Sequence, residues 1–109
     1  MLPPVPTVRA TDVPEGARVL DVRELDEWDA GHIPGALHIP LADVPQRLGE
    51  LPADGDLVVV CRSGVRSAHA VAWLARNGFD ATNLDGGMRA WVSAGRSMVS
   101  ETGAAPMVR

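Results

Sequence analysis

The chain of 109 residues contains one cysteine, Cys61, and no lysine. A lone cysteine has no partner for a disulfide within the chain, so a disulfide-stapled fold is excluded. The sequence therefore favours a reducing, cytoplasmic compartment. All ten basic residues are arginine, which we attribute to genome composition rather than to function.

Long hydrophobic runs are also missing. The longest apolar run covers only residues 57–61, whereas a membrane-spanning helix needs about 20 apolar residues. The first ten residues, MLPPVPTVRA, lack the basic segment and long apolar stretch of a secretory signal. We therefore expect no membrane partner. The length suits a single domain with one hydrophobic core.

Charge is divided unevenly along the chain. Residues 1–60 carry a net charge of −7 and residues 61–109 a net charge of +3. The arginines of the second half form neither a run nor a stripe with aromatic residues, so a nucleic-acid partner is not expected. Arg62 and Arg66 instead flank the loop that follows Cys61, which points to a small anion as the ligand.

Strand-like runs alternate with helical patterns through most of the chain. This βαβα alternation predicts an α/β fold with a mostly parallel sheet. The predicted strands cover residues 17–23, 35–40, 54–60 and 79–84, and the predicted helices cover residues 24–30, 42–51, 67–78 and 85–95.

Local signals refine these elements. Gly31 should end the first helix, and Asp43 should cap the second, with Pro45 in its first turn. The run at 57–60 has no polar alternation, which indicates a strand buried on both faces. Asp85 should cap the last helix, after a tight turn.

The two ends of the chain differ from its middle. Residues 1–12 are expected to form an arm or an edge strand. Residues 96–109 lack periodicity, so we expect a flexible tail. The part between them, residues 13–95, carries every pattern described above and below.

The loop CRSGVRS follows the buried strand, and ligands bind at the carboxyl ends of strands in open parallel sheets. A helix beginning near 65–67 would point its free N–H groups and its positive dipole end at Cys61. With Gly64 in the middle, the loop can form a cradle of amides around an anion. The same field should acidify the thiol. A buried, inert cysteine is the commoner arrangement, but the two arginines, Gly64 and the helix start favour a reactive one.

Three motifs in order, LDVRELDEWDAGHIPGALHIP, CRSGVRS and LDGGMRAW, resemble the single-domain rhodaneses, which are sulfurtransferases. The resemblance covers roughly residues 13–95. It implies a central five-stranded parallel sheet with helices on both faces. It also implies that Cys61 is the nucleophile and carries a persulfide. The donor would be thiosulfate or another sulfane-sulfur compound, and the acceptor cyanide or a thiol.

The residues of the loop suit that chemistry. A Cys61 thiolate would attack the outer sulfur of thiosulfate and expel sulfite, while the loop amides would stabilise the anionic sulfur. Arg66 would hold the sulfonate of the donor, with Arg62 as the second candidate; a surface salt bridge is the alternative role for both arginines. Ser67 could donate a hydroxyl hydrogen bond or cap the helix. The predicted site is Cys61 as catalytic residue with Arg62, Ser63, Gly64, Val65, Arg66 and Ser67 binding the substrate.

Other conspicuous residues receive structural interpretations. Asp21, Arg23 and Glu24 should tie loops together through hydrogen bonds and ion pairs, as the resemblance implies. His32 should form hydrogen bonds after the helix end. His38 and His69 stand alone, and no histidine spacing predicts a metal site. The three tryptophans should pack from helices: Trp28, Trp73 and Trp91.

Alternative functions remain open at this stage. A cysteine-dependent phosphatase or arsenate reductase would use a similar loop, but with five residues between cysteine and arginine, whereas residues 62–65 provide four. A protein-to-protein sulfur carrier or a binding module on the same fold is another alternative. The sequence favours a cytoplasmic sulfurtransferase that needs no metal or organic cofactor. Its partners would be a small anionic sulfur donor and a cyanide, thiol or sulfur-carrier acceptor.

Overall fold

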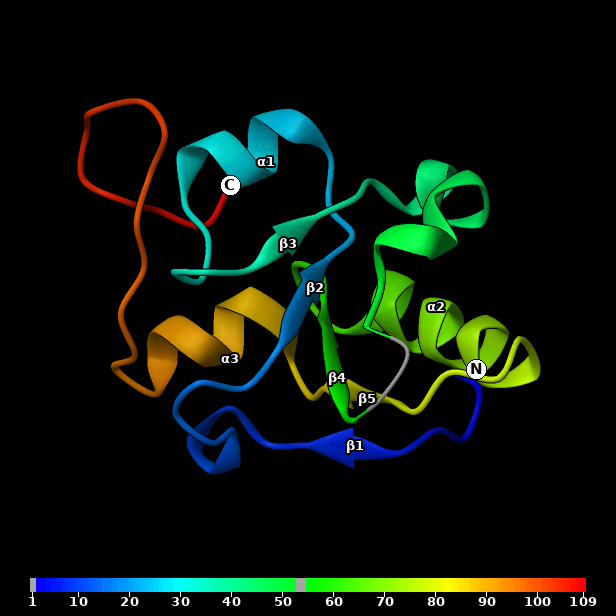
Figure 1. Ribbon diagram of the computed structural model, residues 1–109. Coiled ribbons are helices and arrows are strands. Elements are labelled where there is room, and N and C mark those ends of the chain that lie inside the picture. Colours follow the sequence, from blue (N-terminus) through cyan, green and yellow to red (C-terminus); the bar gives the residue numbers. More distant parts are fainter. Residues whose placement is uncertain (1, 53–54) are drawn as a thin grey trace.

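The computed structural model describes residues 2–52 and 55–109 and contains one five-stranded parallel sheet. Its strands lie in the order β1–β5–β4–β2–β3 (Figure 1). Their bounds are Thr7–Val8 for β1, Val19–Asp21 for β2, Leu37–His38 for β3, Leu57–Val60 for β4 and Ala81–Leu84 for β5. The predicted α/β fold with a parallel five-stranded sheet is confirmed.

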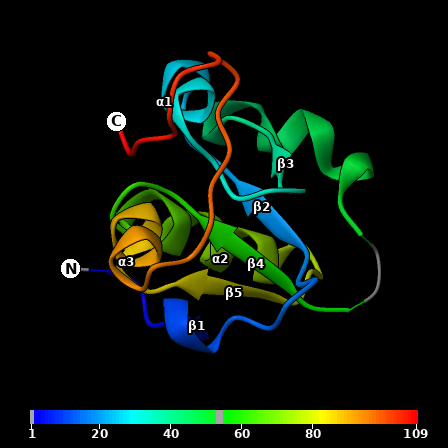
Figure 2. The same ribbon diagram turned by 90° about the vertical axis from the view of Figure 1, so that its left-hand side faces the viewer.

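Helices cover both faces of the sheet, as predicted. The longest, α2 (Val65–Arg76), packs with the 3₁₀ segment η2 (Leu41–Glu50) on one face. On the other face lie α3 (Gly87–Ser93) and the short 3₁₀ turn η1 (Ala10–Asp12). The remaining helix, α1 (Leu25–Ala30), lies beyond the β3 edge (Figures 1 and 2).

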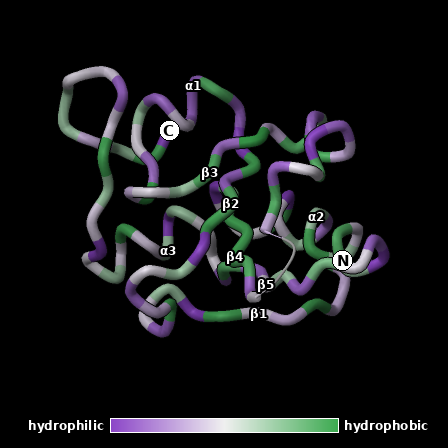
Figure 3. The backbone as a smooth tube through the Cα atoms, in the orientation of Figure 1, coloured by the Kyte–Doolittle hydropathy of each residue, from purple (hydrophilic) through white to green (hydrophobic). Residues whose placement is uncertain are grey.

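The central strand β4 divides the core into two clusters. Its residues Leu57 and Val59 pack with α2, together with Cys61 just beyond the strand. Val58 and Val60 face the opposite way and pack with α3. All four strand residues are buried, and the strand is hydrophobic along its length in Figure 3. The expectation of a strand buried on both faces is thus confirmed, and β4 becomes a rigid base for the loop that follows it.

Two predicted helix caps are wrong. The segment 41–50 is a 3₁₀ helix with a kink at Arg47, and its N-cap is Pro40, so Asp43 lies inside the first turn. Pro45 has no N–H to donate, which favours short-range 3₁₀ bonding such as that from Asp43 N to Pro40 O (2.8 Å). The last helix has Gly86 at its N-cap and no side-chain cap, so Asp85 does not cap it.

The N-terminal arm contributes the edge strand β1, which pairs with β5. The C-terminal segment 96–109 runs from α3 back to α1, where the chain ends (orange to red in Figure 1). Its amides at Glu101 and Met107 donate to the carbonyls of Asp29 and Ala30, at 2.9 and 3.0 Å. A Cβ at Gly31 would approach the backbone nitrogen of Met107 to 2.8 Å, so glycine allows this close approach. The expected flexibility of the tail stays a prediction.

Among the described residues, no helix is both long enough and apolar enough to span a membrane.

Candidate active site

Cys61 lies at the carboxyl end of β4, with β2 and β5 on either side of that strand. Its side chain is almost fully enclosed, at 1% exposure. Helix α2 begins at Val65 as the sequence predicts, so its first turn lies directly against the sulfur. The positive end of the helix dipole therefore points at the thiol.

Hydrogen-bond donors of the loop and of the first turn of α2 surround the Cys61 sulfur. The amides of Gly64 and Ser67 donate to Sγ at 3.1 and 3.4 Å, and the Ser67 hydroxyl lies 3.3 Å away. Burial raises the pKa of the Cys61 thiol, but hydrogen bonds from the Ser67 hydroxyl and from the amides of Ser67, Ser63 and Gly64 outweigh it, so the pKa falls below the ordinary value. The loop therefore favours a sulfur anion.

The loop owes its shape to Gly64. This residue has φ +98°, a left-handed conformation that side chains with a Cβ rarely adopt. A Cβ there would also lie 3.3 Å from the amide nitrogen of Gly86 and 3.5 Å from the carbonyl oxygen of Leu84. Glycine at 64 thus lets the chain turn its amides toward the sulfur while packing on the β5–α3 turn.

The carbonyls of the loop point at α3. Met88 N donates to Cys61 O at 2.8 Å, and Arg89 N donates to Arg62 O at 3.1 Å. Gly87, at φ +62°, sits so close that a Cβ would meet the Cys61 carbonyl oxygen and the backbone of Arg62. The start of α3 therefore binds the loop's acceptors, which leaves its donors facing the sulfur.

Ser67 and Asn83 form a buried hydrogen-bonded pair behind the sulfur. The Ser67 hydroxyl donates to Asn83 Oδ1 at 2.5 Å, and Asn83 Nδ2 donates to the carbonyl oxygen of Gly64 at 3.1 Å. The N-cap of α2 is Gly64, without a side-chain cap, so a capping role for Ser67 is wrong. Sequence reasoning missed Asn83, because nothing in the run ATNL of β5 marks it as a neighbour of Cys61.

The arginines of the loop are placed differently. Arg66 forms a two-pronged ion pair with Glu27 of α1, at 2.8 and 2.9 Å. This bond holds the pKa of Glu27 below its ordinary value. The exposed residues of the loop are Arg62, Ser63 and Val65. The predicted site residues 61–67 thus divide into buried members around the sulfur and members that reach the surface. Glu27, 39 positions away in sequence from Arg66, was not predicted, since no spacing signal joins the two.

The motif LDVRE is structural, as expected. Arg23 and Asp21 are both fully buried and form an ion pair with bonds of 2.7–3.1 Å. Arg23 also donates to the carbonyl oxygens of Gly31 and Glu27, at 2.8 and 3.3 Å. Glu24 caps α1 through a capping box with Glu27. The pair thus anchors α1, and with it the carboxylate that faces Arg66.

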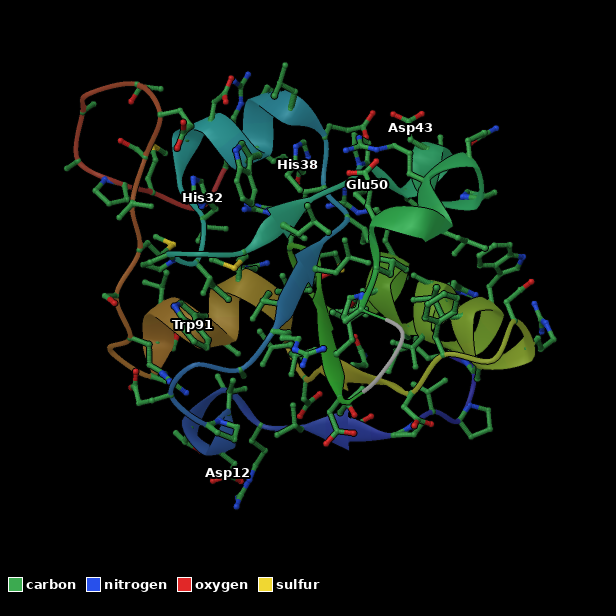
Figure 4. The ribbon with its side chains drawn as sticks, in the orientation of Figure 1. Asp12, His32, His38, Asp43, Glu50 and Trp91 are labelled. Carbon is green, nitrogen blue, oxygen red and sulfur yellow. The ribbon has the colours of Figure 1, made fainter. Side chains whose placement is uncertain are left out.

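The histidines and tryptophans also have structural partners. His32 lies 2.8 Å from the Glu101 carboxylate and 3.1 Å from the carbonyl oxygen of Ile33, which confirms its hydrogen-bonding role. Trp28 stacks on His32 and on His38, which lie on the α1 side of the sheet in Figure 4. Trp28, Trp73 and Trp91 all lie on helices, and Trp91 is buried. Within residues 2–52 and 55–109, no group of three or more His, Cys, Asp or Glu residues could hold a metal ion.

Comparison with known proteins places the chain in a family. The model of the rhodanese-like domain matches residues 9–94. A sulfurtransferase from Allochromatium vinosum is 40% identical over 90 residues, which cover 82% of this chain and 84% of that protein. The "Putative sulfur carrier protein YrkF" of Bacillus subtilis is 41% identical over 81 residues, which cover 73% of this chain and 44% of that protein. The matched region is thus less than half of the Bacillus protein.

A solved structure shows the same fold. The rhodanese-related protein of Thermoplasma volcanium superposes with a TM-score of 0.82 at 32% identity, and the match covers 86% of this chain and 97% of that one. The parallel α/β fold of this chain agrees with that match. The chain belongs to the rhodanese-like family of sulfurtransferases and sulfur carriers.

Proposed function

We propose that the protein transfers sulfane sulfur from thiosulfate or a related anionic donor to cyanide or a thiol through a persulfide on Cys61. The observation that carries the proposal is the enclosure of Sγ by the Gly64 and Ser67 donors at 3.1–3.4 Å. These donors face a position where negative charge develops on sulfur. The sulfurtransferase of Allochromatium vinosum, with its match to most of this chain, supports the same reaction class.

The proposed cycle has two displacements. The Cys61 thiolate attacks the outer sulfur of thiosulfate, a new S–S bond forms, and sulfite leaves with the electron pair of the broken S–S bond. Cyanide then attacks the terminal sulfur of the persulfide, thiocyanate departs, and the thiolate returns. Atoms and electrons balance without a metal or an organic cofactor. A thiol acceptor would take the sulfur in the same way, becoming a persulfide itself.

Donor recognition falls to the loop side chains. The Arg66 guanidinium, at 36% side-chain exposure, is accessible to a ligand and suits a sulfonate. Because Glu27 already binds it, the donor must compete with that carboxylate or share the arginine with it. Arg62, Ser63 and Val65 are exposed and would contact the outer part of the donor. A single reduced thiol suits the cytoplasm, which we propose as the location.

Intact-protein mass spectrometry tests the proposal. Incubation with thiosulfate should add one sulfur atom to the protein, and cyanide should then remove it. Cys61→Ser is the matched control and should remain unchanged. No gain from thiosulfate or from any other sulfane donor would overturn sulfur transfer and would direct attention to phosphate and arsenate substrates or to a binding role.

A protein acceptor is a second candidate, favoured by the similarity to a sulfur carrier protein of Bacillus subtilis. A preformed Cys61 persulfide offered a protein thiol and a small thiol at equal concentration would distinguish the two. Faster discharge to the protein thiol would support a carrier role. Equal rates would support small-molecule transfer.

A further inference from the structure

The Ser67 hydroxyl has one hydrogen and two neighbours that can accept it. The Cys61 sulfur lies 3.3 Å from Oγ, and Asn83 Oδ1 lies 2.5 Å from it. Ser67 is fully buried, and Asn83 is 5% exposed, so bulk water does not compete. The direction of this hydrogen decides whether Ser67 gives a hydrogen bond to the sulfur or receives one.

Asn83 resolves the choice in the resting protein. Its other amide atom faces the carbonyl oxygen of Gly64 at 3.1 Å. A carbonyl can only accept, so the NH₂ group must lie there and Oδ1 must face Ser67. Oδ1 can only accept as well, so the Ser67 hydrogen is directed to Asn83. A lone pair of Ser67 Oγ then faces Sγ, where it accepts the S–H of the neutral thiol.

Ionisation of Cys61 changes what the sulfur needs from Ser67, from a hydrogen-bond acceptor to a donor. The S–H bond breaks, the proton passes to bulk water, and the electron pair stays on sulfur. A lone pair of Ser67 would now face an anion, so the hydroxyl turns and donates to the sulfur, because hydrogen bonds to charged acceptors are about twice as strong as neutral ones. Asn83 Oδ1 then loses its donor in a buried place, which is unfavourable.

We propose that Asn83 is a positioning residue that holds the Ser67 hydroxyl as an acceptor for the resting thiol and releases it to donate when the sulfur is an anion. Asn83 thus opposes ionisation, whereas the Gly64 and Ser67 amides favour it. The effect moderates the reactivity of a thiol that the loop otherwise acidifies. The Ser67 hydroxyl thus has two orientations, toward Asn83 when the sulfur is a thiol and toward Sγ when the sulfur is an anion.

The charged groups around Cys61 do not duplicate this effect. They are the Arg66–Glu27 pair from α2 and α1, the buried Asp21–Arg23 pair at the end of β2, Arg62 of the loop, Asp85 after β5 and Arg89 of α3. In the described part of the chain, none of these side chains hydrogen-bonds to Sγ. All of them remain in place when Asn83 or Ser67 is changed.

The test is a double-mutant cycle in which the pKa of Cys61 is measured for each variant. The ultraviolet absorbance of the thiolate or the pH profile of alkylation gives this pKa. Asn83→Val should lower the pKa of Cys61 by about one unit. The reason is that ionisation of the variant no longer leaves the buried acceptor Asn83 Oδ1 without a donor. In a Ser67→Ala background the same change should leave the pKa where it was. Gly64 O keeps a donor in either case, from Ala68 N at 3.3 Å. Thr82→Val, at the neighbouring position of β5, is the control and should shift neither background.

The inference rests on the proposed function only in needing an ionisable Cys61, and the titration uses no sulfur donor. Failure of sulfur transfer with a positive cycle would therefore leave Asn83 in its assigned role. An equal pKa shift in both backgrounds, or none in either, would overturn that role.

If Asn83→Val does not fold, Asn83→Ala carries the same prediction. Infrared spectroscopy of the thiol gives a measurement independent of Asn83 variants. Ser67→Ala should move the S–H stretch to higher frequency, because the S–H then loses its acceptor. An unchanged stretch would equally overturn the proposal.

Discussion

Two arginine–carboxylate pairs stand within the same part of the molecule and differ in burial. Arg23 and Asp21 have fully buried side chains, whereas Arg66 and Glu27 are 36% and 13% exposed. Both pairs have good two-pronged geometry. They also meet at one residue, because Arg23 donates to the Glu27 carbonyl oxygen while Arg66 binds its carboxylate.

The difference in burial suits the Arg23–Asp21 pair to holding the fold together and the Arg66–Glu27 pair to the proposed binding of the donor. A buried pair resists the loss of one partner, because the remaining charge is stranded away from water. A partly exposed pair such as Arg66–Glu27 is weaker, since water and ions screen it, and the arginine can exchange its carboxylate partner for a ligand. The same chemical group fixes α1 at position 23 and, under the proposed function, would bind the anionic donor at position 66.

The largest effect is expected from breaking the buried pair. Arg23→Met leaves the Asp21 carboxylate without its partner, so the free energy of unfolding should fall by about 3–5 kcal/mol. Urea denaturation measures this value. Arg76→Met, which removes an exposed arginine from the end of α2, is the control and should change stability by less than about 1 kcal/mol. A loss of that small size for Arg23→Met would contradict a supporting role.

Arg66→Met should affect donor binding more than stability, the opposite of Arg23→Met. We expect the free energy of unfolding to change by no more than about 1 kcal/mol. The KM for thiosulfate should rise about tenfold, because a charge-assisted bond to the donor is lost. Steady-state kinetics beside Arg62→Met would identify which arginine binds the donor. A larger rise for Arg62→Met would transfer the sulfonate contact to Arg62.

Glu27→Gln removes the competing charge and should lower the KM for thiosulfate about threefold at neutral pH. The amide oxygen of Gln can still accept the bond from Glu24 N that closes the capping box at 3.1 Å, so α1 should persist. An unchanged or higher KM would show that Glu27 positions Arg66 rather than competing with the donor.

The KM difference between the wild-type protein and Glu27→Gln should depend on pH, because Arg66 alters the acidity of Glu27. The hydrogen bonds from Arg66 hold the pKa of Glu27 below the ordinary value, so the stability that Glu27 contributes is present above the unfolded-state pKa. It is lost as pH falls through the lower, folded-state value. Over the same interval the wild-type protein should come to resemble Glu27→Gln in KM. Kinetics and unfolding in parallel acid series measure both trends.

Salt should give the smallest effect. Raising ionic strength from about 0.05 to about 0.5 M should reduce the KM difference between wild type and Arg66→Met about twofold, since exposed charges are screened. The unfolding penalty of Arg23→Met should remain unchanged over the same range. If salt reduced the KM effect of Arg66→Met and the unfolding penalty of Arg23→Met equally, the two ion pairs would not differ in their exposure to solvent screening.

Much of this architecture could be predicted from the sequence because its signals are local. The apolar run 57–60 predicts a fully buried strand, and Gly64 followed by a helical pattern predicts where α2 begins. Cys61 and its loop follow from those two features. The element at 41–50 was predicted with the wrong type and cap, because Pro45 and a kink at Arg47 outweigh its amphipathic pattern.

The missed features depend on contacts between distant positions. Glu27 and Arg66 are 39 positions apart, Ser67 and Asn83 are 16 apart, and His32 and Glu101 are 69 apart. Each partner has a common residue type in an ordinary local pattern. Only the packing of α1, β5 and the C-terminal segment on the sheet brings the partners together, so a single sequence holds no signal for them.

The backbone of the Cys61 loop separates two properties that can be altered independently. The carbonyls of Cys61 and Arg62 are bound by amides at the start of α3, and the amides of Gly64 and Ser67 face the sulfur. The exposed side chains at Arg62, Ser63 and Val65 take no part in either set of bonds. Under the proposed function, a library randomised at these three positions would vary the choice of donor while the cradle around the sulfur stays constant, and the loop would be a modular starting point for engineering sulfur-transfer specificity.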